Sequence, residues 1–414
     1  DLSRLPFPYP RDLSGLENKI IYYEASRGCP FSCGYCLSSA EGAPRLRPTA
    51  DVRRHMTIFL DAEVPRVKLT DRTFNAVESF ALEIWGFLIE NDNGVTNFHF
   101  EIAADLLSEK ALALLERARP GLFQFEIGVQ STNGYALAEV SRATDVLRLL
   151  STVRRIRSFR NIHLHLDLIA GLPGEGLESF KKSFNDVYDT RPDQIQLGFL
   201  KLLKGTRLRE RAGEWGIVYG QYPPYEVLRT RWLSYDDLLA LKDVAEMAGV
   251  FYNSGKFTWT LTYLVKYFAS YYAFYESLAD YWRERGYFNA PNGKWLAHDA
   301  LYGFCEKYCA DETEREIILD FMRFDLYANE NERGAPECCG KKRVGVSRGG
   351  RPERGRDYRV EFFRFDLLAW VVGIYGENPP PIVRRENFLR FEYPDVGRQS
   401  AFTLLDRVKE EGMR

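Results

Sequence analysis

The stretch "IHLHLDLI", residues 162–169, alternates apolar and polar side chains along almost its whole length. One face would carry Ile162, Leu164, Leu166 and Leu168, and the other His163, His165, Asp167 and Ile169. This period of two predicts a β-strand with one buried face and one mainly polar face. Residues 97–102, 123–129 and 194–200 alternate in the same manner. A single strand pattern therefore recurs along the first half of the chain.

Two further strand candidates, residues 19–25 and 66–70, complete a series of six. Segments with helical spacing, such as 77–90 and 108–118, lie between them, and this alternation predicts a parallel sheet. Parallel strands covered on both faces are usually apolar throughout, whereas these strands keep one polar face. We therefore predict an α/β fold, a partial six-stranded (β/α)6 TIM-like barrel with a polar interior. An antiparallel sheet with one solvated face is the alternative.

The chain outside the strands changes character twice. The proline-rich opening, residues 1–18, is expected to be an extended linker from an upstream domain, and Asp1 in place of Met indicates a processed or excised chain. Residues 19–205 would form the barrel, and 206–235 a connecting segment. Residues 236–414 would form a mainly helical C-terminal domain.

Two features of this C-terminal region suggest its local structure. Aromatic residues recur every fourth position and predict one stripe on one helix, packed against the barrel: Trp259, Tyr263, Tyr267, Tyr271 and Tyr275. Residues 331–359 are rich in Gly, Arg and Lys, and we predict a mobile basic loop there.

Composition narrows the class of protein. The formal net charge of the 414 residues is −2, so no overall field favours nucleic acid, and no nucleic-acid partner is expected. No run of 18 apolar residues is present, so no membrane partner is expected either. The seven cysteines are odd in number and clustered, which favours metal binding in a reducing, cytoplasmic setting over a disulfide framework.

Three of those cysteines, Cys29, Cys33 and Cys36, lie within eight positions. A structural zinc site needs four ligands, and His55, the nearest downstream candidate, has no partner at zinc-finger spacing. Ferredoxin-type clusters also use four cysteines. Three thiolates on a [4Fe–4S] cube would leave one iron open to a substrate or cosubstrate. The incomplete ligand set therefore indicates a catalytic cluster.

The segment "RGCPFSCGYC", residues 27–36, has Tyr35 directly before its last cysteine and follows the first strand of the predicted barrel. In this it resembles the radical S-adenosylmethionine (radical SAM) superfamily, over roughly residues 20–205. The resemblance implies that the three cysteines ligate a [4Fe–4S] cluster whose open iron binds S-adenosylmethionine. It further implies an electron donor such as flavodoxin or ferredoxin, and reductive cleavage to a 5′-deoxyadenosyl radical that abstracts hydrogen from a substrate.

Further positions resemble oxygen-independent coproporphyrinogen oxidase, a member of the same superfamily. "TDRTF", residues 70–74, stands where that family has a glycine-rich turn for the methionine amino group, and here Asp71 and Thr73 could serve instead. Glu101 matches an acid that faces the same amino group. Tyr35 is counted with these cofactor-binding residues.

The nucleoside contacts are inferred from the same resemblance. Gln130 of "GVQ" would meet the ribose, and Arg142 the methionyl carboxylate, although Arg142 could also be a helix-surface ion-pair partner. "DLIAGLPGE", residues 167–175, resembles the fifth-strand motif. It would place Asp167 near the ribose hydroxyls and Ile169 to Gly171 beside the adenine.

The linker and the cysteine segment together look like the cobalamin-dependent branch of the superfamily, and residues 236–414 resemble the uncharacterised C-terminal extension of some of its members. Cobalamin would then be bound by a domain missing from this chain, and the reaction would be methylation of an unactivated carbon. A radical SAM oxidase or rearrangement enzyme without cobalamin is one alternative. A non-catalytic iron–sulfur binding module is another.

Other metal-binding residue types remain to be explained. His99, His163 and His165 fall on the polar strand faces, where they could bind a metal but are better explained as interior or substrate-contacting histidines. Cys305, Cys309, Cys338 and Cys339 could form an auxiliary cluster, although vicinal cysteines rarely ligate one metal comfortably.

Overall fold

The structure is a computed structural model that describes residues 2–10, 12–16, 19–38, 42–290, 293–329, 335–339, 357–373, 380–393 and 404–405. The chain divides into two compact units, Asp1–Ala245 and Glu246–Arg414, and each is described by itself. Most of the basic loop predicted at 331–359 lies outside the described residues. Within the described residues, no helix has the length and apolar character needed to cross a membrane.

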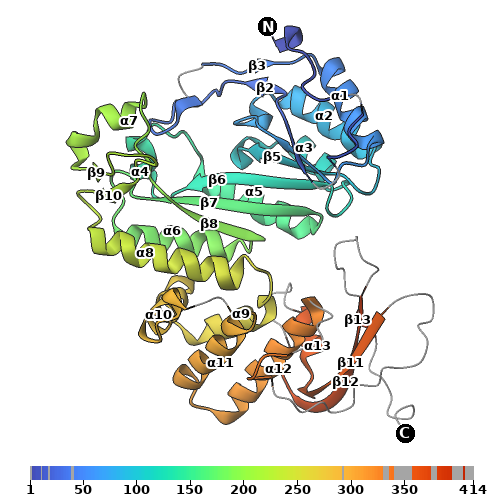
Figure 1. The fold of residues 1–414 in the computed structure, drawn as a ribbon, viewed down its shortest axis with the longest axis vertical. Helices are drawn as coiled ribbons and strands as arrows, with labels where there is room; N and C mark the ends of the chain where they lie inside the picture. The colour runs from blue at the N-terminus through green and yellow to red at the C-terminus, as the bar shows by residue number, and fades with distance from the viewer. Residues whose placement is uncertain are drawn as a thin grey trace. The chain divides into compact units, whose positions relative to one another are not determined.

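The first unit is built on one six-stranded sheet in the order β1-β4-β5-β6-β7-β8 (Figure 1). Every neighbouring pair is parallel, which confirms the predicted parallel sheet and excludes the antiparallel alternative. Its strands are β1 (Ile20–Tyr23), β4 (Arg66–Leu69), β5 (Asn97–Ile102), β6 (Phe123–Gln130), β7 (Ile162–Ala170) and β8 (Gln194–Phe199). All six lie where the sequence predicted strands.

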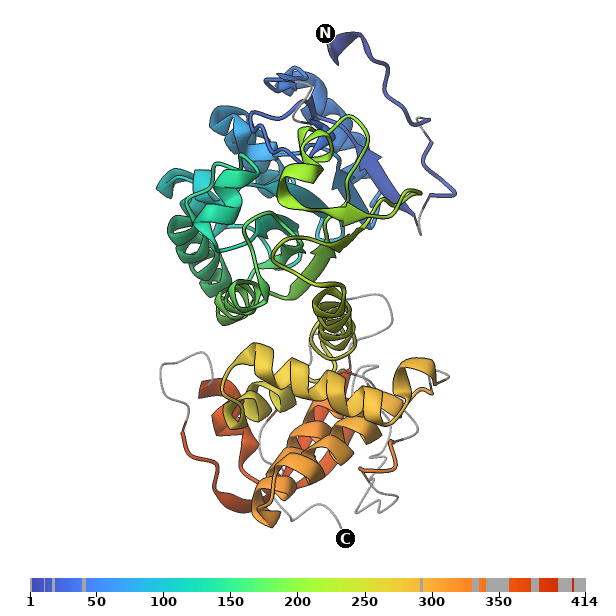
Figure 2. The ribbon, with the colours of Figure 1, turned by 90° about the vertical axis from the view of Figure 1, so that its left-hand side faces the viewer.

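Helices connect these strands and form a layer around the sheet, so the unit is a partial (β/α)6 barrel (Figure 2). The helices of this unit are α1 (Thr49–Asp61), α2 (Glu78–Glu90), α3 (Glu109–Leu115), α4 (Gly134–Glu139), α5 (Val146–Phe159), α6 (Leu177–Asp189), α7 (Arg207–Glu210) and α8 (Tyr235–Met247), the last of which continues two residues past the boundary. A short hairpin of β9 (Val218–Tyr219) and β10 (Val227–Arg229) follows the last barrel strand.

Burial alternates along the strands as the sequence predicted. In β7, Leu164, Leu166 and Leu168 are completely buried, and the strand packs against α5 and α6. The side chains between them, such as His165 and Asp167, are only partly buried and share the opposite, inner face of the sheet. The apolar outer face is therefore the core of the unit, and the polar inner face is available for chemistry.

The N-terminal segment packs on the first strand. The Tyr9 hydroxyl donates to the Tyr22 carbonyl oxygen at 2.6 Å and accepts from the Tyr22 amide at 2.9 Å, so it satisfies backbone groups of the edge strand β1. Phe7 stacks on His55 of α1 at a ring-centroid distance of 4.5 Å. His55 is buried and bonded to the Tyr23 hydroxyl, which gives it a place in the core.

The second unit is mainly helical, as predicted, but it also contains a small antiparallel sheet that the sequence analysis did not predict. The sheet has the order β11-β12-β13. The elements are α9 (Thr258–Leu264), α10 (Tyr271–Glu284), α11 (Leu296–Tyr308), α12 (Glu312–Asn329), β11 (Asp357–Phe365), α13 (Leu367–Gly373), β12 (Arg384–Tyr393) and β13 (Leu404–Leu405).

The prediction of one aromatic stripe on one helix is wrong. Helix α9 ends at Leu264, a 3₁₀ turn (Val265–Tyr267) follows, and α10 begins only at Tyr271. Ser270 caps α10 by accepting a hydrogen bond from the Ala273 amide, so a local capping signal interrupts the helical periodicity. The Tyr263 ring packs on Phe321 of α12 within the second unit.

The two faces of β7 predict opposite responses to truncation. Leu166→Ala should lower the free energy of unfolding by about 2–5 kcal/mol, because it leaves a cavity in the completely buried outer face. Chemical denaturation of the purified chain measures this change. His163→Ala, on the partly exposed inner face of the same strand, is the matched control and should stay within about 0.5 kcal/mol. Equal losses in the two variants would contradict the assignment of the faces.

Candidate functional site

The three cysteines lie on a loop directly after β1. Strands β2 (Ser26–Arg27) and β3 (Arg45–Leu46) pair antiparallel and bring the two ends of this loop together. At its start, Gly28 has a φ of +101°, and a Cβ there would lie 2.9 Å from the Gly42 carbonyl oxygen. The Cys29 amide donates to that same oxygen at 3.1 Å. Only glycine fits this close approach, so Gly28 determines how the chain enters the cysteine loop.

Backbone contacts from distant segments hold the middle of the loop. The Gly34 amide donates to the Val140 carbonyl at 2.8 Å, just beyond α4, and the Gly34 carbonyl accepts from the Leu208 amide at 2.9 Å. Asp71 holds the chain before the loop, because its Oδ2 accepts from the Ala25 amide at 3.0 Å. Asp71 is buried, and burial raises its pKa to about 6. The structure thus places Asp71 against the backbone at the loop entrance.

Polar side chains lie close to Cys29 and Cys33. Thr73 Oγ1 lies 3.6 Å from Cys29 Sγ, and Arg142 Nη1 lies 3.8 Å from Cys33 Sγ. Tyr35 interacts with both Cys33 and Arg142, and burial raises the pKa of its phenol. The Arg142 guanidinium beside Cys33 suits a cysteine that carries negative charge, as a cluster thiolate does.

The described residues contain no group of three His, Cys, Asp or Glu side chains that could hold one metal ion. This finding gives no support to a zinc site at the loop or to a histidine metal site on the strands within those residues. Cluster thiolates each bind a different iron and need not converge on one point, so the cysteine loop still fits an iron–sulfur cube. All seven cysteines, which the described residues include, lack a disulfide bond.

Gln130 and Arg142 meet at the end of β6. The parallel register with β7 shifts between Gly128 and Gln130, a bulge that redirects the last residue of the strand. Gln130 has a φ of +69°, which is strained for a residue with a Cβ and is often found at functional sites. Arg142 donates to the Gly128 carbonyl. The buried Gln130 Oε1 and Arg142 Nε have no hydrogen-bond partner within the described part of the chain. Buried polar atoms without a partner are expected where a polar ligand binds, and these two atoms meet that description.

Charged side chains meet on the inner face farther down the strands. Glu126 of β6 accepts from Lys68 Nζ of β4 at 3.0 Å and lies 3.0 Å from His99 Nε2 of β5. The contacts with His99 and Lys68 lower the pKa of Glu126 to about 2. Lys68 was not predicted as a site residue from the sequence. Continuing the period-two pattern through residues 66–69 would have placed it on this face.

Glu101 and Asp167 share this inner face, as the alternation predicted. Burial, reinforced by the charge of Glu126, raises the pKa of Glu101 to about 7. Its nearest cation is Arg72, at 3.9 Å. Asp167 lies 3.1 Å from His165 Nε2, and burial raises the pKa of this carboxyl group too. Burial alone would lower the pKa of His165, but the Asp167 contact outweighs it and raises that pKa.

The end of β7 leads into a glycine turn. Ile169 pairs with Gly198 of β8. Gly171 has a φ of +95°, and a Cβ there would lie 2.9 Å from a Val227 methyl group, so glycine is required at this close approach. The structure thus brings Gln130, Arg142, Asp167 and this turn to the carboxyl ends of neighbouring strands, where βα barrels place their sites. The cysteine loop follows the carboxyl end of β1 on the same sheet.

Family models match two parts of the chain. Residues 23–187 match the radical SAM superfamily, and residues 213–348 match a protein family of unknown function, DUF4080. The first match contains the cysteine loop and every site residue described above except Gly198, Leu208 and Val227.

Curated relatives match over the same region. The tRNA-2-methylthio-N(6)-dimethylallyladenosine synthase of Herpetosiphon aurantiacus is 22% identical over 198 residues, which cover 45% of this chain and 44% of its own length. The ribosomal protein uS12 methylthiotransferase RimO of Geotalea uraniireducens is 24% identical over 210 residues, which cover 46% of this chain and 45% of its own. This chain thus spans less than half the length of these relatives.

Solved structures include two radical SAM enzymes with partial similarity. The methyltransferase TsrM from Kitasatospora setae aligns with a TM-score of 0.46 and 17% identity, covering 54% of this chain and 46% of that chain. Coproporphyrinogen III oxidase (HemN) from Escherichia coli aligns with a TM-score of 0.39 and 17% identity, covering 56% and 52%.

The family match and the geometry agree with each other. Residues 23–187 contain the three-cysteine loop, the parallel strands β4 to β7 and their polar ends. A domain of this type implies a [4Fe–4S] cluster and S-adenosylmethionine as cofactors. Residues 23–187 therefore form a radical SAM domain.

Proposed function

We propose that this chain binds a [4Fe–4S] cluster through Cys29, Cys33 and Cys36 and uses S-adenosylmethionine to start a radical reaction on a polar substrate. The observation that carries the proposal is the cysteine loop, whose sulfurs face Thr73 and Arg142 beside the strand ends. Reduction of bound S-adenosylmethionine by such a cluster supplies a 5′-deoxyadenosyl radical for hydrogen abstraction.

We assign the cofactor contacts to the residues around the loop. Gln130 Oε1 and Arg142 Nε are two buried polar atoms at the strand ends that have no partner in the described residues, so we assign them to the ribose and the carboxylate. Glu101 and Asp167 would hold the amino group and the ribose hydroxyls from the inner face. Tyr35 and Thr73 would lie at the edge of the cluster. Ile169 and Gly171 would lie beside the adenine. Asp71 would keep the loop entrance in place through the Ala25 amide.

The inner face supports a polar substrate. Lys68, His99, Glu126 and His165 place both signs of charge on it, and such groups bind polar ligands by ion pairs and hydrogen bonds. The net charge of −2 gives no overall attraction to nucleic acid, so a small polar molecule or a peptide is favoured over RNA.

Methylation of an unactivated carbon is the reaction we propose. The matched relatives include a methylthio-nucleoside synthase and a methylthiotransferase, which supports the transfer of a carbon-containing group. Cobalamin as methyl donor, bound by residues outside this chain, and a flavodoxin- or ferredoxin-type electron donor are parts of the same proposal. Anaerobic purification of the full-length gene product, followed by an assay of bound cobalamin and of reductive S-adenosylmethionine cleavage, tests them together. Cleavage without cobalamin would favour oxidation or rearrangement.

Replacing a cluster cysteine should abolish iron binding. In Cys29→Ala, Cys33→Ala and Cys36→Ala, a cube with only two thiolates is labile, so the iron content after anaerobic reconstitution should fall from about four per chain to near zero. Iron analysis and the electron paramagnetic resonance signal of the reduced chain measure this loss.

The matched controls are Cys338→Ala and Cys339→Ala, whose sulfurs lie 3.8 Å apart in the second unit. Both should keep the full iron content and the signal. Iron retained in Cys33→Ala would refute the proposed ligand set, and iron lost from the controls would indicate an auxiliary cluster.

Glu101 should make S-adenosylmethionine binding depend on pH. Its pKa of about 7 means that the carboxylate forms as pH rises through neutrality, and an ionised group binds the methionyl ammonium better. We expect the affinity of the cluster-loaded chain to increase about tenfold between pH 6 and 8, the scale of a charged hydrogen bond. Anaerobic equilibrium dialysis measures this affinity.

The control for this prediction is Glu101→Gln, which cannot ionise. The groups that influence Glu101 are Glu126, Arg72, Lys68 and Asp167, and all of them remain in the variant. The difference between the two pH profiles therefore isolates Glu101 from those groups and from the ligand's own amine. Identical profiles would contradict the assigned role.

A further inference from the structure

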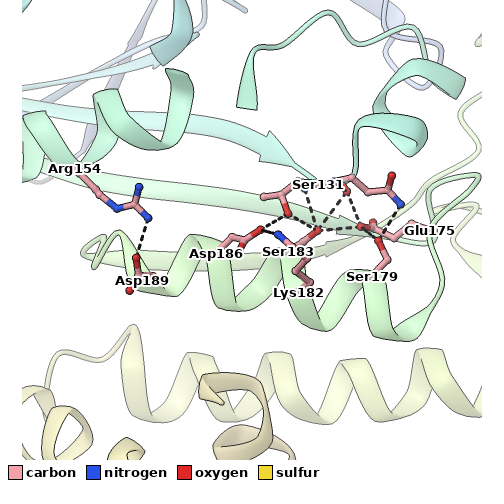
Figure 3. Close-up of polar contacts among 10 residues, drawn as sticks. Ser131, Arg154, Glu175, Ser179, Lys182, Ser183, Asp186 and Asp189 are labelled. Atoms are coloured by element: carbon pink, nitrogen blue, oxygen red, sulfur yellow. Dashed lines mark hydrogen bonds and ion pairs between the residues drawn. The ribbon is translucent and has the colours of Figure 1, made fainter. Parts of the chain in front are cut away.

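Glu175, the last residue of the "DLIAGLPGE" segment, lies completely buried among hydroxyl groups (Figure 3). Its Oε1 accepts from Ser131 Oγ at 2.6 Å, from Ser183 Oγ at 3.0 Å and from Ser179 Oγ at 3.4 Å. Its Oε2 is buried and has no hydrogen-bond partner in the described residues. Burying a carboxyl group costs free energy, so we expect this group and its contacts at Oε1 to have a specific role.

The hydrogen bonds around the three serines have a definite direction. Ser131 Oγ accepts from the Asn133 amide, Ser183 Oγ from the Thr132 amide, and Ser179 Oγ from Asn133 Nδ2, at 2.9–3.0 Å. Each hydroxyl oxygen is therefore engaged as an acceptor, and its proton is directed to Glu175 Oε1. Three converging donors are best satisfied by an ionised carboxylate.

The groups around Glu175 connect the segments assigned above to the nucleoside. Ser131 directly follows the strained Gln130, and Glu175 follows the glycine turn that begins at Gly171. Asn133 Nδ2 also donates to the Gly174 carbonyl at 3.3 Å, so a second contact joins the two segments. Helix α6 holds both of them through Ser179 and Ser183, which lie one helical turn apart.

The same network reaches the cysteine loop through α4. The Asn133 side chain accepts from the Tyr135 and Ala136 amides and so caps the start of this six-residue helix. Just beyond its other end, the Val140 carbonyl accepts from the Gly34 amide between Cys33 and Cys36. Displacing the 131–133 turn would thus shift both Gln130 and the support of the cysteine loop.

We propose that Glu175 is a positioning residue for S-adenosylmethionine, whose ionised carboxylate holds the Gln130–Asn133 turn and the Gly171–Gly174 turn together. The inference rests on the proposed function, since it needs those two turns to bind the nucleoside. Glu175 itself touches no ligand. It acts through Ser131 on Gln130, and through α4 on the cysteine loop.

The isosteric variant Glu175→Gln tests the proposal, because it keeps the shape and removes the charge. Burial raises the pKa of Glu175 to about 7, and the groups that contact its carboxylate are the hydroxyls of Ser131, Ser183 and Ser179. Asp186, on the same helix as Ser183, bonds to Thr132 Oγ1 and to Lys182. In the cluster-loaded full chain, the variant should bind S-adenosylmethionine like the wild type near pH 6. At pH 8 it should bind about threefold to tenfold more weakly.

Thermal stability should change in the opposite sense. The pKa of Glu175 is raised in the folded state, so the wild type loses stability as pH rises from about 4.5 to about 7, and the glutamine variant does not. As the pH rises, the melting temperature of the variant should therefore increase relative to that of the wild type. Over the same change, its affinity for S-adenosylmethionine should decrease relative to that of the wild type. A merely structural role would move both quantities in the same direction, and that result would overturn the proposal.

Two further variants complete the experiment. Ser179→Ala removes the longest of the three contacts and should weaken binding less than Glu175→Gln does. Glu178→Gln changes an exposed carboxylate that pairs with Lys181 on the same helix, and it should alter neither quantity. Equal affinity of Glu175→Gln and wild type at every pH overturns the inference alone. Absence of binding in the wild type overturns the proposed function and the inference with it.

Discussion

The side-chain period of the parallel strands is the constraint on which the rest of the first unit depends. Successive residues point to opposite faces, and the parallel register aligns the same parity across β4, β5, β6 and β7. The outer residues are apolar and completely buried, so the strands cannot slip by one residue without exposing the core. Because burial fixes the outer face, the alternation of side chains also places Lys68, Glu126 and His165 on the inner face.

The site at the strand ends combines rigid and strained parts. The cysteine loop depends on Gly28 at its entrance and on backbone contacts to Val140 and Leu208, segments far away in the sequence. Gln130 adopts a left-handed conformation next to a strand bulge. Strain of this kind persists only where the surroundings determine the conformation, and the hydrogen bonds around Ser131 and Asn133 do so here.

Buried carboxyl groups have different tasks in the two units. Glu101 and Glu175 of the first unit lie within or behind the proposed cofactor site. Asp325 of the second unit accepts from the Trp259 and Thr260 amides and caps α9, and burial raises its pKa to about 7. The same physical situation, a carboxyl group removed from water, thus occurs at a proposed cofactor site in one unit and at a helix cap in the other.

Local pattern was sufficient for the architecture of the first unit. The sequence predicted six strands, and the alternation in residues 162–169 and its three repeats predicted the faces of four of them, because burial on one side of a sheet leaves a period of two in the sequence. The spacing of Cys29, Cys33 and Cys36 predicted an iron–sulfur cluster, since the three proposed ligands come from one short loop. The inner-face positions of Glu101 and Asp167 followed from the same parity.

Contacts between distant segments were decided only by the tertiary structure. Periodicity suggested one helix through Tyr267 and Tyr271, but the Ser270 cap divides it. The pairing of β11 with β12 joins residues that are 19 to 36 positions apart in the sequence, and it leaves no short-range signal. Glu175 was visible in its motif, yet its partners Ser131 and Ser183 come from a different loop and a helix. Sequence periodicity thus determined which face each residue takes, whereas only packing determined which residues from distant segments meet, because that depends on how the whole chain closes.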